Sequence, residues 1–312
     1  MDNLCHSLVG AAIGKAGLAR RTTLGMSTLV IANNLPDVDV AVFATNTLAM
    51  SFRRGWTHGV LAQAVLPVFL AGAMLAYDRL VVQRRADAPP PAAARELLLL
   101  SYLGVLLHVF MDLMNSYGVR LLMPLSERWF YGDALFIVDP WLYLALGLGW
   151  WMSWRRERKG VARAGRPARL GLALAAGYVL TMLASNVLAR TAVSGGLDRA
   201  GRPADTRFMV TPVAVNPFSR EVVVDLGDRY EKGKLWFEPL PRFRPAGFGM
   251  PKGMDAPDAQ AALQSPRARA FLRWSRFPFV QVDRNTSPPA IWLNDYRYAN
   301  AGAYGWSATQ IQ

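Results

Sequence analysis

Apolar residues form long runs along the first two thirds of the chain. A helix needs about 17–25 largely apolar residues to cross the roughly 30 Å of hydrocarbon in a bilayer, and four runs satisfy or approach this length. These runs are Gly59–Tyr77, Glu96–Leu113, Ala134–Trp154 and Leu170–Ala189. Four of them in succession favour a transmembrane helical bundle over the core of a soluble domain.

Two weaker apolar segments precede these runs. Leu4–Leu18 is short, and Leu24–Leu48 is interrupted at Asn33–Asp39 by the sequence Asn-Asn-Leu-Pro-Asp-Val-Asp. Pro36 is expected to break the helix there, because proline lacks an N–H group and clashes with the preceding turn. Irregular backbone at membrane depth is tolerated only where it is buried in protein or lines a cavity. We therefore expect an irregular loop beside a site.

Residues 190–312 have a different pattern, without any run long enough to span a bilayer. One helix is predicted over about Asp258–Trp274. Short β-type stretches, separated by Pro, Gly and Asn-Pro signals, are Phe208–Val215, Glu221–Asp225, Lys234–Phe237, Phe279–Asp283 and Ala290–Leu293. The predicted fold is thus mainly α: a polytopic transmembrane bundle over residues 1–189, followed by a small extracytoplasmic α+β domain over residues 190–312.

The positive charge of the chain is explained largely by this topology. The net charge is +13, and linkers 78–95 and 155–169 carry 11 of the 18 basic residues found in residues 1–189. Short cytoplasmic loops collect Lys and Arg, so both linkers are predicted to be cytoplasmic and the C-terminal domain to lie outside. Nucleic-acid binding is the usual interpretation of such a positive charge. It is disfavoured here, because the basic residues lie in the linkers where membrane topology predicts them. The predicted location is a bacterial inner membrane.

Candidate chemistry is concentrated at the outward-facing ends of the apolar segments. The single Cys5 excludes an internal disulfide and a thiolate zinc cluster, and the chain has three histidines. The polar residues at this level are His6, Asp37, Asp39, Arg53, Arg54, His58, His108, Asp112, Asn115, Asp133 and Asp139. Ionisable groups at membrane depth are costly and mark functional sites by default.

A helical pair makes metal binding the leading hypothesis for this layer. His108 and Asp112 are four residues apart, so on a helix they project from nearly the same face. Imidazole with carboxylate suits zinc, manganese or iron. His6, Asp37, Asp39 and His58, at the same level as this pair, strengthen the hypothesis.

Five sequence blocks in this region resemble a known family, the LexA-binding, inner membrane-associated hydrolases of bacteria. The blocks are Met1–Leu8 with His6, Asn34-Leu-Pro-Asp-Val-Asp39, Arg54-Gly-Trp-Thr-His58, Leu107-His-Val-Phe-Met-Asp112 with Asn115-Ser-Tyr-Gly118, and Tyr131-Gly-Asp133 through Asp139-Pro-Trp141. The resemblance covers about residues 1–190. It implies a membrane-bound metal-dependent hydrolase, similar to zinc phospholipase C, with one or two divalent ions bound by His6, Asp37, Asp39, His58, His108 and Asp112.

The expected reaction is metal-assisted hydrolysis of a membrane lipid or lipid-linked phosphoester. Asp37, Asp133 or Asp139 would accept the proton of the attacking water, and Arg53, Arg54 and Asn115 would bind substrate. Two interpretations stay open for individual residues: the arginines as an interfacial pair that contacts headgroups, and Asp139 as a helix N-cap before Pro140. Two other functions also stay open: a non-hydrolytic transporter, and a scaffold protein in which the metal is only a staple.

Overall fold

The computed structural model describes residues 1–45, 48–299 and 309–311. The chain folds as two compact units: unit 1 comprises Met1–Ala41 and Arg53–Leu183, and unit 2 comprises Val42–Phe52 and Ala184–Gln312. The units join within helix α7 (Arg166–Arg199), six residues before the division that the sequence pattern predicts. The candidate site lies wholly in unit 1.

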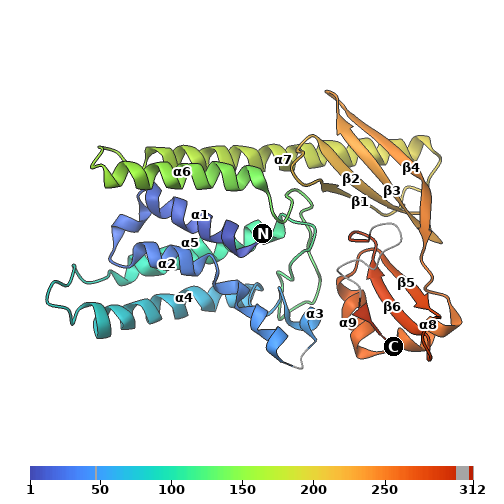
Figure 1. The fold of residues 1–312 in the computed structure, drawn as a ribbon, viewed down its shortest axis with the longest axis horizontal. Coiled ribbons are helices and arrows are strands. Elements are labelled where there is room, and N and C mark those ends of the chain that lie inside the picture. The colour runs from blue at the N-terminus through green and yellow to red at the C-terminus, as the bar shows by residue number, and fades with distance from the viewer. Residues whose placement is uncertain (46–47, 300–308, 312) are drawn as a thin grey trace. The chain divides into compact units, whose positions relative to one another are not determined.

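Unit 1 is a helical bundle (Figure 1). In it, α1 packs against α2 and α6, and α5 packs against α2 and α4. Its elements are α1 (Asn3–Ala16), η1 (Leu18–Arg21), α2 (Gly25–Ala32), the start of η2 (Leu35–Ala44), α4 (Val60–Tyr77), η3 (Asp78–Val82), α5 (Ala94–Leu113), α6 (Pro140–Arg158) and the first half of α7. The short helix α3 (Ala49–Phe52) belongs to unit 2.

Three helices in the described part of the chain are long and apolar enough to cross a membrane: Val60–Val82, Ala94–Leu113 and Arg166–Arg199. Large apolar side chains on them face outward, as a lipid environment favours; Phe69 and Leu180, for example, are each 67% exposed. The predicted run Ala134–Trp154 differs from the structure. Its helix, α6, begins only at Pro140, because the Asp139 side chain caps it, and it ends in a charged turn.

The basic linkers gather at one end of unit 1. Glu157, at the end of α6, pairs with Lys15 and Arg20, and Arg21 lies 3.5 Å from Glu96 at the start of α5. Asp112 is sixteen residues further along α5, about 24 Å away at 1.5 Å per residue. The predicted site residues on α5 and the basic linkers are therefore at opposite ends of this unit.

The segment after Pro36 is more regular than predicted. In place of an irregular loop, it forms the 3-10 helix η2 (Leu35–Ala44), with Asp37 in its first turn. Tighter 3-10 turns follow a helix end readily, and the Asp37 N–H donates to the Asn34 carbonyl at 3.1 Å. Both carboxylates of the motif, Asp37 and Asp39, point into unit 1 and are buried.

Unit 2 is built on an antiparallel four-stranded sheet in the order β1-β2-β3-β4. One face packs against Ala189, Val193 and Leu197 of α7. The other packs against Phe277, Phe279 and Tyr296, which lie in or beside a second, three-stranded sheet in the order β5-β6-β7. The elements are β1 (Phe208–Pro212), β2 (Ser219–Asp225), β3 (Arg229–Phe237), β4 (Pro241–Pro251), α8 (Pro257–Ala262), α9 (Pro266–Trp274), β5 (Pro278–Asp283), β6 (Ala290–Asp295) and β7 (Thr309–Gln310). The β-rich character predicted for this region is confirmed.

Two details of unit 2 differ from the prediction. The helix expected over Asp258–Trp274 is two helices, because Pro266 starts α9 and Ser265 caps it. The strand β4 has no counterpart in the prediction, since three prolines in Pro241–Pro251 disfavour a strand. Its position at the sheet edge explains why it tolerates them, because an edge strand need not donate every backbone hydrogen bond.

A buried ion pair in unit 2 leads to a prediction about acid stability. Asp295 accepts bonds from Arg297 at 2.8 and 2.9 Å. Burial alone would raise the pKa of Asp295, but the charge and hydrogen bonds of Arg297 and a hydrogen bond from Ser275 lower it overall. The stability from this carboxylate is therefore complete above the unfolded pKa of about 3.9 and declines as pH falls towards the lower folded value.

We therefore expect Asp295→Asn to lose about 3–5 kcal/mol of stability at pH 7, because it leaves the Arg297 cation buried without its partner. The gap between wild type and variant should narrow only below about pH 4. Thermal unfolding of the full chain in detergent, followed from pH 7 to pH 2, measures this difference in stability. Asp228→Asn, at a side chain that is 75% exposed, is the control, and a gap that is constant with pH would contradict the prediction.

Candidate metal centre

Four buried side chains converge in unit 1. Asp37, His58, His108 and Asp112 each direct one ligand atom into a common space, and these atoms all lie within 4.8 Å of one another. They come from three places in the sequence: the first turn of η2, the turn before α4, and the last two turns of α5. The side chains of His58, His108 and Asp112 are fully buried, and Asp37 is 6% exposed.

Five of the six distances among the four ligand atoms are close to those of a tetrahedral metal site. The Nε2 atoms of His58 and His108 are 3.2 Å apart. The Asp112 Oδ2 atom is 3.3 Å from the first and 3.7 Å from the second, and Asp37 Oδ1 is 3.8 Å from each. Ligands at about 2.0–2.1 Å from a zinc ion would be separated by about 3.3–3.4 Å in a regular tetrahedron. A small divalent cation therefore fits among these donors.

In both histidines the Nδ1 atom carries the proton, so the Nε2 atom has a lone pair with which it can bind a metal. The His108 Nδ1 atom lies 2.7 Å from the carbonyl oxygen of Asn33, which can only accept, so Nδ1 carries the proton. The Thr57 hydroxyl lies 2.9 Å from His58 Nδ1 and donates to Asp39 at 3.2 Å, so it accepts from His58. Two unprotonated Nε2 atoms then face each other, which a cation between them would stabilise. Metal-bound histidines are usually oriented in this way.

A glycine allows the contact between His108 and Asn33. Gly104 lies one turn before His108 on α5, and a Cβ atom there would be 2.4 Å from the Cβ atom of Ala32. The close approach of α5 to the end of α2 therefore depends on the absence of a side chain at this position. It brings the Asn33 carbonyl within reach of the imidazole.

Two carboxylate oxygens in the group accept no hydrogen bond, Asp37 Oδ1 and Asp112 Oδ2, although Arg54 forms an ion pair with Asp112 Oδ2 at 3.1 Å. Burial and the neighbouring Asp112 carboxylate raise the pKa of Asp37, and His58 and Arg54 offset this only in part. Buried polar atoms normally have partners. A cation at this position would satisfy both oxygens and favour their ionised forms.

Asp39 lies beside the group rather than in it. It was predicted as a ligand, but its Oδ2 accepts from the Arg54 backbone N–H at 2.7 Å and from Thr57 at 3.2 Å, and its Oδ1 lies 3.4 Å from Arg53 Nε. The structure places Asp39 where it orients His58 through Thr57. The sequence spacing of two carboxylates on either side of Val38 does not distinguish these two roles.

Arg54 is directed inward. Its guanidinium lies 3.1 Å from Asp112 Oδ2 and 3.5 Å from Asn115 Oδ1, and the side chain is 5% exposed. Burial alone would lower the pKa of Arg54, but Asp112 and Asp37 raise it, so this residue is a permanent cation. The predicted role in gripping substrate fits Arg53 better, because its side chain is 21% exposed.

The other predicted site residues surround the group at different distances. His6 stacks on His108 at 3.9 Å, and its Nε2 lies 3.3 Å from Asp112 Oδ1, which the Met1 amine also contacts. Asn115 uses its side-chain oxygen to accept from the Tyr117 N–H at 2.9 Å. His6 and Asn115 thus support the centre through Asp112 and Arg54.

Asp133 and Asp139 lie in the segment between α5 and α6. Asp133 is buried, and its neighbours Gly132 and Ala134 bond through their backbone N–H groups to the last residues of α5. Asp139 caps α6, with bonds from the Trp141 and Leu142 N–H groups and from the Tyr178 hydroxyl at 2.9 Å. The N-cap interpretation of Asp139 therefore matches the contacts it makes.

Two residues that orient the histidines, Asn33 and Thr57, are not among the predicted site residues. Thr57 directly precedes His58, and a hydroxyl beside a candidate ligand is a signal that could have identified it. Asn33 acts through its backbone carbonyl, so its side chain carries no signal for this role.

We expect Thr57→Val to weaken metal binding about 10–100-fold without removing the site, the usual effect of losing a group that orients a ligand. Valine keeps the shape of threonine but offers His58 no acceptor. Titration of the purified chain with zinc in detergent measures the change. Thr45→Val, at a hydroxyl that bonds the Val42 carbonyl in η2, is the control, and equal affinities in both variants would contradict the prediction.

Comparison with known proteins identifies a family that matches the N-terminal part of the chain. Residues 1–191 match the family described as YdjM inner membrane protein. A relative from Bacillus subtilis (strain 168), named uncharacterized protein YfhP, is 25% identical over 156 residues, or 46% of this chain and 44% of the relative, so the chain spans less than half of that protein. No solved structure matches the chain. These matches bear out the inner-membrane part of the resemblance, and hydrolysis stays a prediction. Because residues 1–191 are more than half of the chain, this protein belongs to the YdjM inner membrane protein family.

Proposed function

We propose that this protein is a membrane-bound, metal-dependent hydrolase that acts on a lipid or lipid-linked phosphoester. The observation that carries the proposal is the convergence of Asp37, His58, His108 and Asp112 on one buried point within a membrane protein. Two imidazoles and two carboxylates suit zinc first, with manganese or iron as alternatives. A divalent ion held there would lower the pKa of a bound water towards about 7 and polarise the bond under attack.

The residues around the centre have separate roles in this proposal. Thr57 and the Asn33 carbonyl hold the two imidazoles in place. Arg53, the partly exposed arginine, binds the phosphate group of the substrate by charge-assisted hydrogen bonds. Asp133, buried in the segment between α5 and α6, would accept a proton, because Asp37 would bind the metal and Asp139 caps α6.

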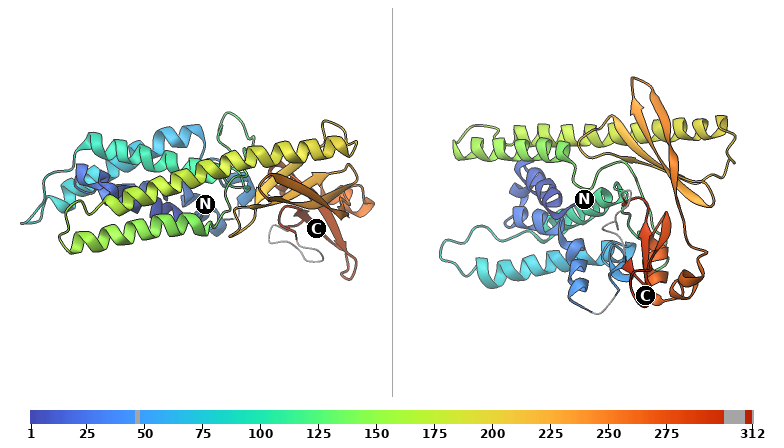
Figure 2. Two further views of the ribbon diagram at one scale, coloured as in Figure 1. Left: turned by 90° about the horizontal axis from the view of Figure 1, so that it is seen from above. Right: turned by 45° about the vertical axis from the view of Figure 1, so that its right-hand side comes forward.

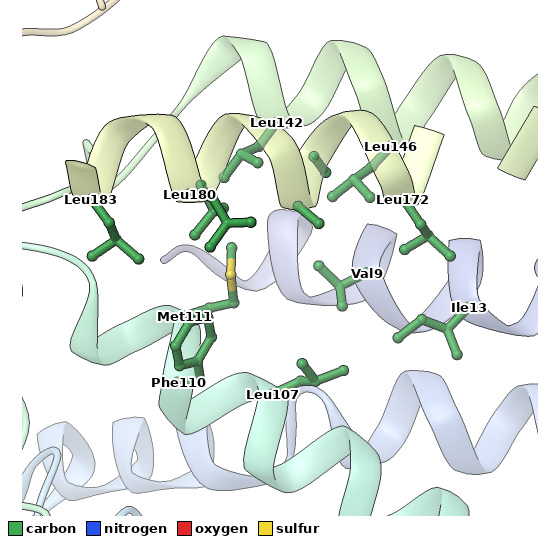
Figure 3. Close-up of a pocket in the computed structure, with 13 residues that line it drawn as sticks. Val9, Ile13, Leu107, Phe110, Met111, Leu142, Leu146, Leu172, Leu180 and Leu183 are labelled. Atoms are coloured by element: carbon green, nitrogen blue, oxygen red, sulfur yellow. The ribbon is translucent and has the colours of Figure 1, made fainter. Parts of the chain in front are cut away.

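An apolar cavity near the centre supports a lipid substrate. It has a volume of about 300 Å³ and lies among α1, α5, α6 and α7 (Figure 3). Every residue that lines it is apolar, and Leu107 and Met111 each precede a residue of the centre, His108 and Asp112. The size is at the lower end of the range for ligand pockets, about 300–1,000 Å³. A hydrocarbon chain matches such a lining.

The proposed orientation places the metal centre at the outer face of the inner membrane. Arginine-rich linkers gather at the opposite end of unit 1, and such loops are typical of the cytoplasmic side. In a multi-pass chain of this topology the region after Ala189 is extracytoplasmic. A reporter fused after Gln312 is expected to be active outside the cytoplasm, and a cytoplasmic signal would overturn the orientation.

One observation favours a second candidate, a scaffold protein in which the metal is structural. Structural zinc sites have four protein ligands, whereas catalytic sites keep a position open for water. The four donors here are enough to fill a tetrahedral shell by themselves. A metal in such a closed shell would fasten η2, the turn before α4 and α5 to one another.

The deciding experiment is a turnover assay on the metal-loaded chain in detergent or nanodiscs, with a panel of phospholipids and polyprenyl phosphates. Hydrolysis of at least one substrate, lost in Asp37→Asn and in the presence of chelator, supports the hydrolase. Stoichiometric metal without turnover of any substrate supports the scaffold. Metal-dependent passage of ions into sealed vesicles, again without turnover, would support a transporter.

A further inference from the structure

A second cavity in unit 1 lies away from the metal centre, along the groove between α6 and α7. Figures 1 and 2 show these helices antiparallel and side by side in unit 1. The cavity has a volume of about 740 Å³, within the range for ligand pockets. Its length is lined by apolar side chains, many of them about half exposed, such as Leu144, Leu148, Met152, Leu170 and Leu174.

Small residues set the depth of this groove. A Cβ atom at Gly149 would lie 3.1 Å from the Cα atom of Gly171, and one at Gly171 would lie 2.4 Å from the Ala145 carbonyl oxygen. The backbones of α6 and α7 therefore touch, because neither glycine places a side chain between them. The larger side chains on either side of this contact form the walls of the groove.

One end of the groove is positively charged. Arg156 and Arg166 line it there, and the Arg156 Nε atom is buried without a hydrogen-bond partner. The carboxylate nearest in sequence, Glu157, pairs instead with Lys15 and Arg20. Within the described ranges, neither Arg156 nor Arg166 forms an ion pair. The first residues of α7 add the positive end of a helix dipole at the same place.

We propose that the groove between α6 and α7 binds one anionic phospholipid, with its phosphate between Arg156 and Arg166 and its acyl chains along the apolar wall. An apolar channel that ends in arginines matches a lipid, whose charge and hydrocarbon are joined, better than a free phosphate. Basic pockets between membrane helices at the cytoplasmic end are a known type of lipid site. This site is independent of the proposed hydrolase, because Arg156 belongs to the end of unit 1 opposite to His108 and Asp112.

The test compares lipid binding by the full chain in detergent, using phosphatidylglycerol and phosphatidylcholine. Native mass spectrometry measures the bound lipid, and thermal unfolding measures the Tm. Phosphatidylglycerol is expected to stay bound and to raise the Tm, and phosphatidylcholine to do so at least tenfold less effectively. Glycerol 3-phosphate, which has the charge without the chains, is expected to have no effect; an effect equal to that of the lipid would identify a free-phosphate site and overturn the proposal.

Variants separate the groove from general positive charge. Arg156→Gln with Arg166→Gln is expected to weaken phosphatidylglycerol binding at least tenfold. Arg84→Gln with Arg85→Gln removes the same charge from another exposed linker and should leave binding unchanged. Leu148→Trp, which fills the groove without altering charge, should also weaken binding. Equal binding by the wild type and the Arg156/Arg166 variant, or equal loss in both arginine pairs, would overturn the proposal.

Discussion

Replacing His108 by glutamine is expected to remove stoichiometric divalent metal from the purified chain. The imidazole Nε2 lies 3.2–3.8 Å from the other three ligand atoms, so its loss leaves three donors and an unfilled position. The affinity for zinc should fall more than 100-fold, beyond the roughly 10–100-fold effect of residues that only orient ligands. Metal per chain, measured by mass spectrometry after dialysis in detergent, tests this.

Two controls make the result specific. Ser101→Ala alters another fully buried residue of α5, two turns before His108, and should keep its metal. Zinc should also stabilise the wild type, by about 2.7 kcal/mol at 100 times its Kd, and should stabilise His108→Gln much less. If His108→Gln kept both the metal and the zinc-dependent stability, the four residues would not form the site.

Most helices of the bundle could be predicted from the sequence, because each one is a single continuous apolar run. Runs such as Glu96–Leu113 are apolar throughout, and their length is set by the bilayer rather than by packing. Deviations occur where a single residue ends a helix. Pro140 delays the start of α6, and Pro266 divides the predicted helix of unit 2. Both prolines are visible in the sequence, but whether a proline lies within an element or starts one depends on the neighbouring cap.

The sequence predicts which residues lie at the site better than it predicts what each of them does there. The predicted outward layer includes Asp37, His58, His108 and Asp112, which the structure brings together, because ionisable groups on apolar helices have few reasons to be there. The roles of Asp39 and Arg54 depend on which way each side chain turns within a short loop. Spacing does not encode this direction. Arg54 neutralises Asp112 from within, an arrangement that only three-dimensional contacts reveal.

The charge balance of the metal-free centre gives the second large prediction, on Arg54. Arg54→Gln is expected to destabilise the chelator-treated chain by about 3–5 kcal/mol, because it leaves the Asp112 carboxylate buried with one cation fewer. The loss of stability should lie near the lower end of this range, since the Met1 amine still contacts Asp112. Thermal unfolding in detergent with chelator measures the loss.

The cause can be isolated because the chain supplies both a matched neighbour and a compensating change. Arg53→Gln removes the adjacent, partly exposed charge and should cost less than Arg54→Gln, because Asp39 keeps its bonds from the Arg54 backbone N–H and the Thr57 hydroxyl. Adding Asp112→Asn to Arg54→Gln removes both members of the buried pair and should recover much of the stability, because an unpaired buried charge costs more than a missing pair. Zinc should stabilise Arg54→Gln more than the wild type, since the ion would then supply the positive charge that Asp112 lacks. Equal losses for Arg53→Gln and Arg54→Gln, or no recovery in the double variant, would show that Arg54 acts by packing rather than by charge.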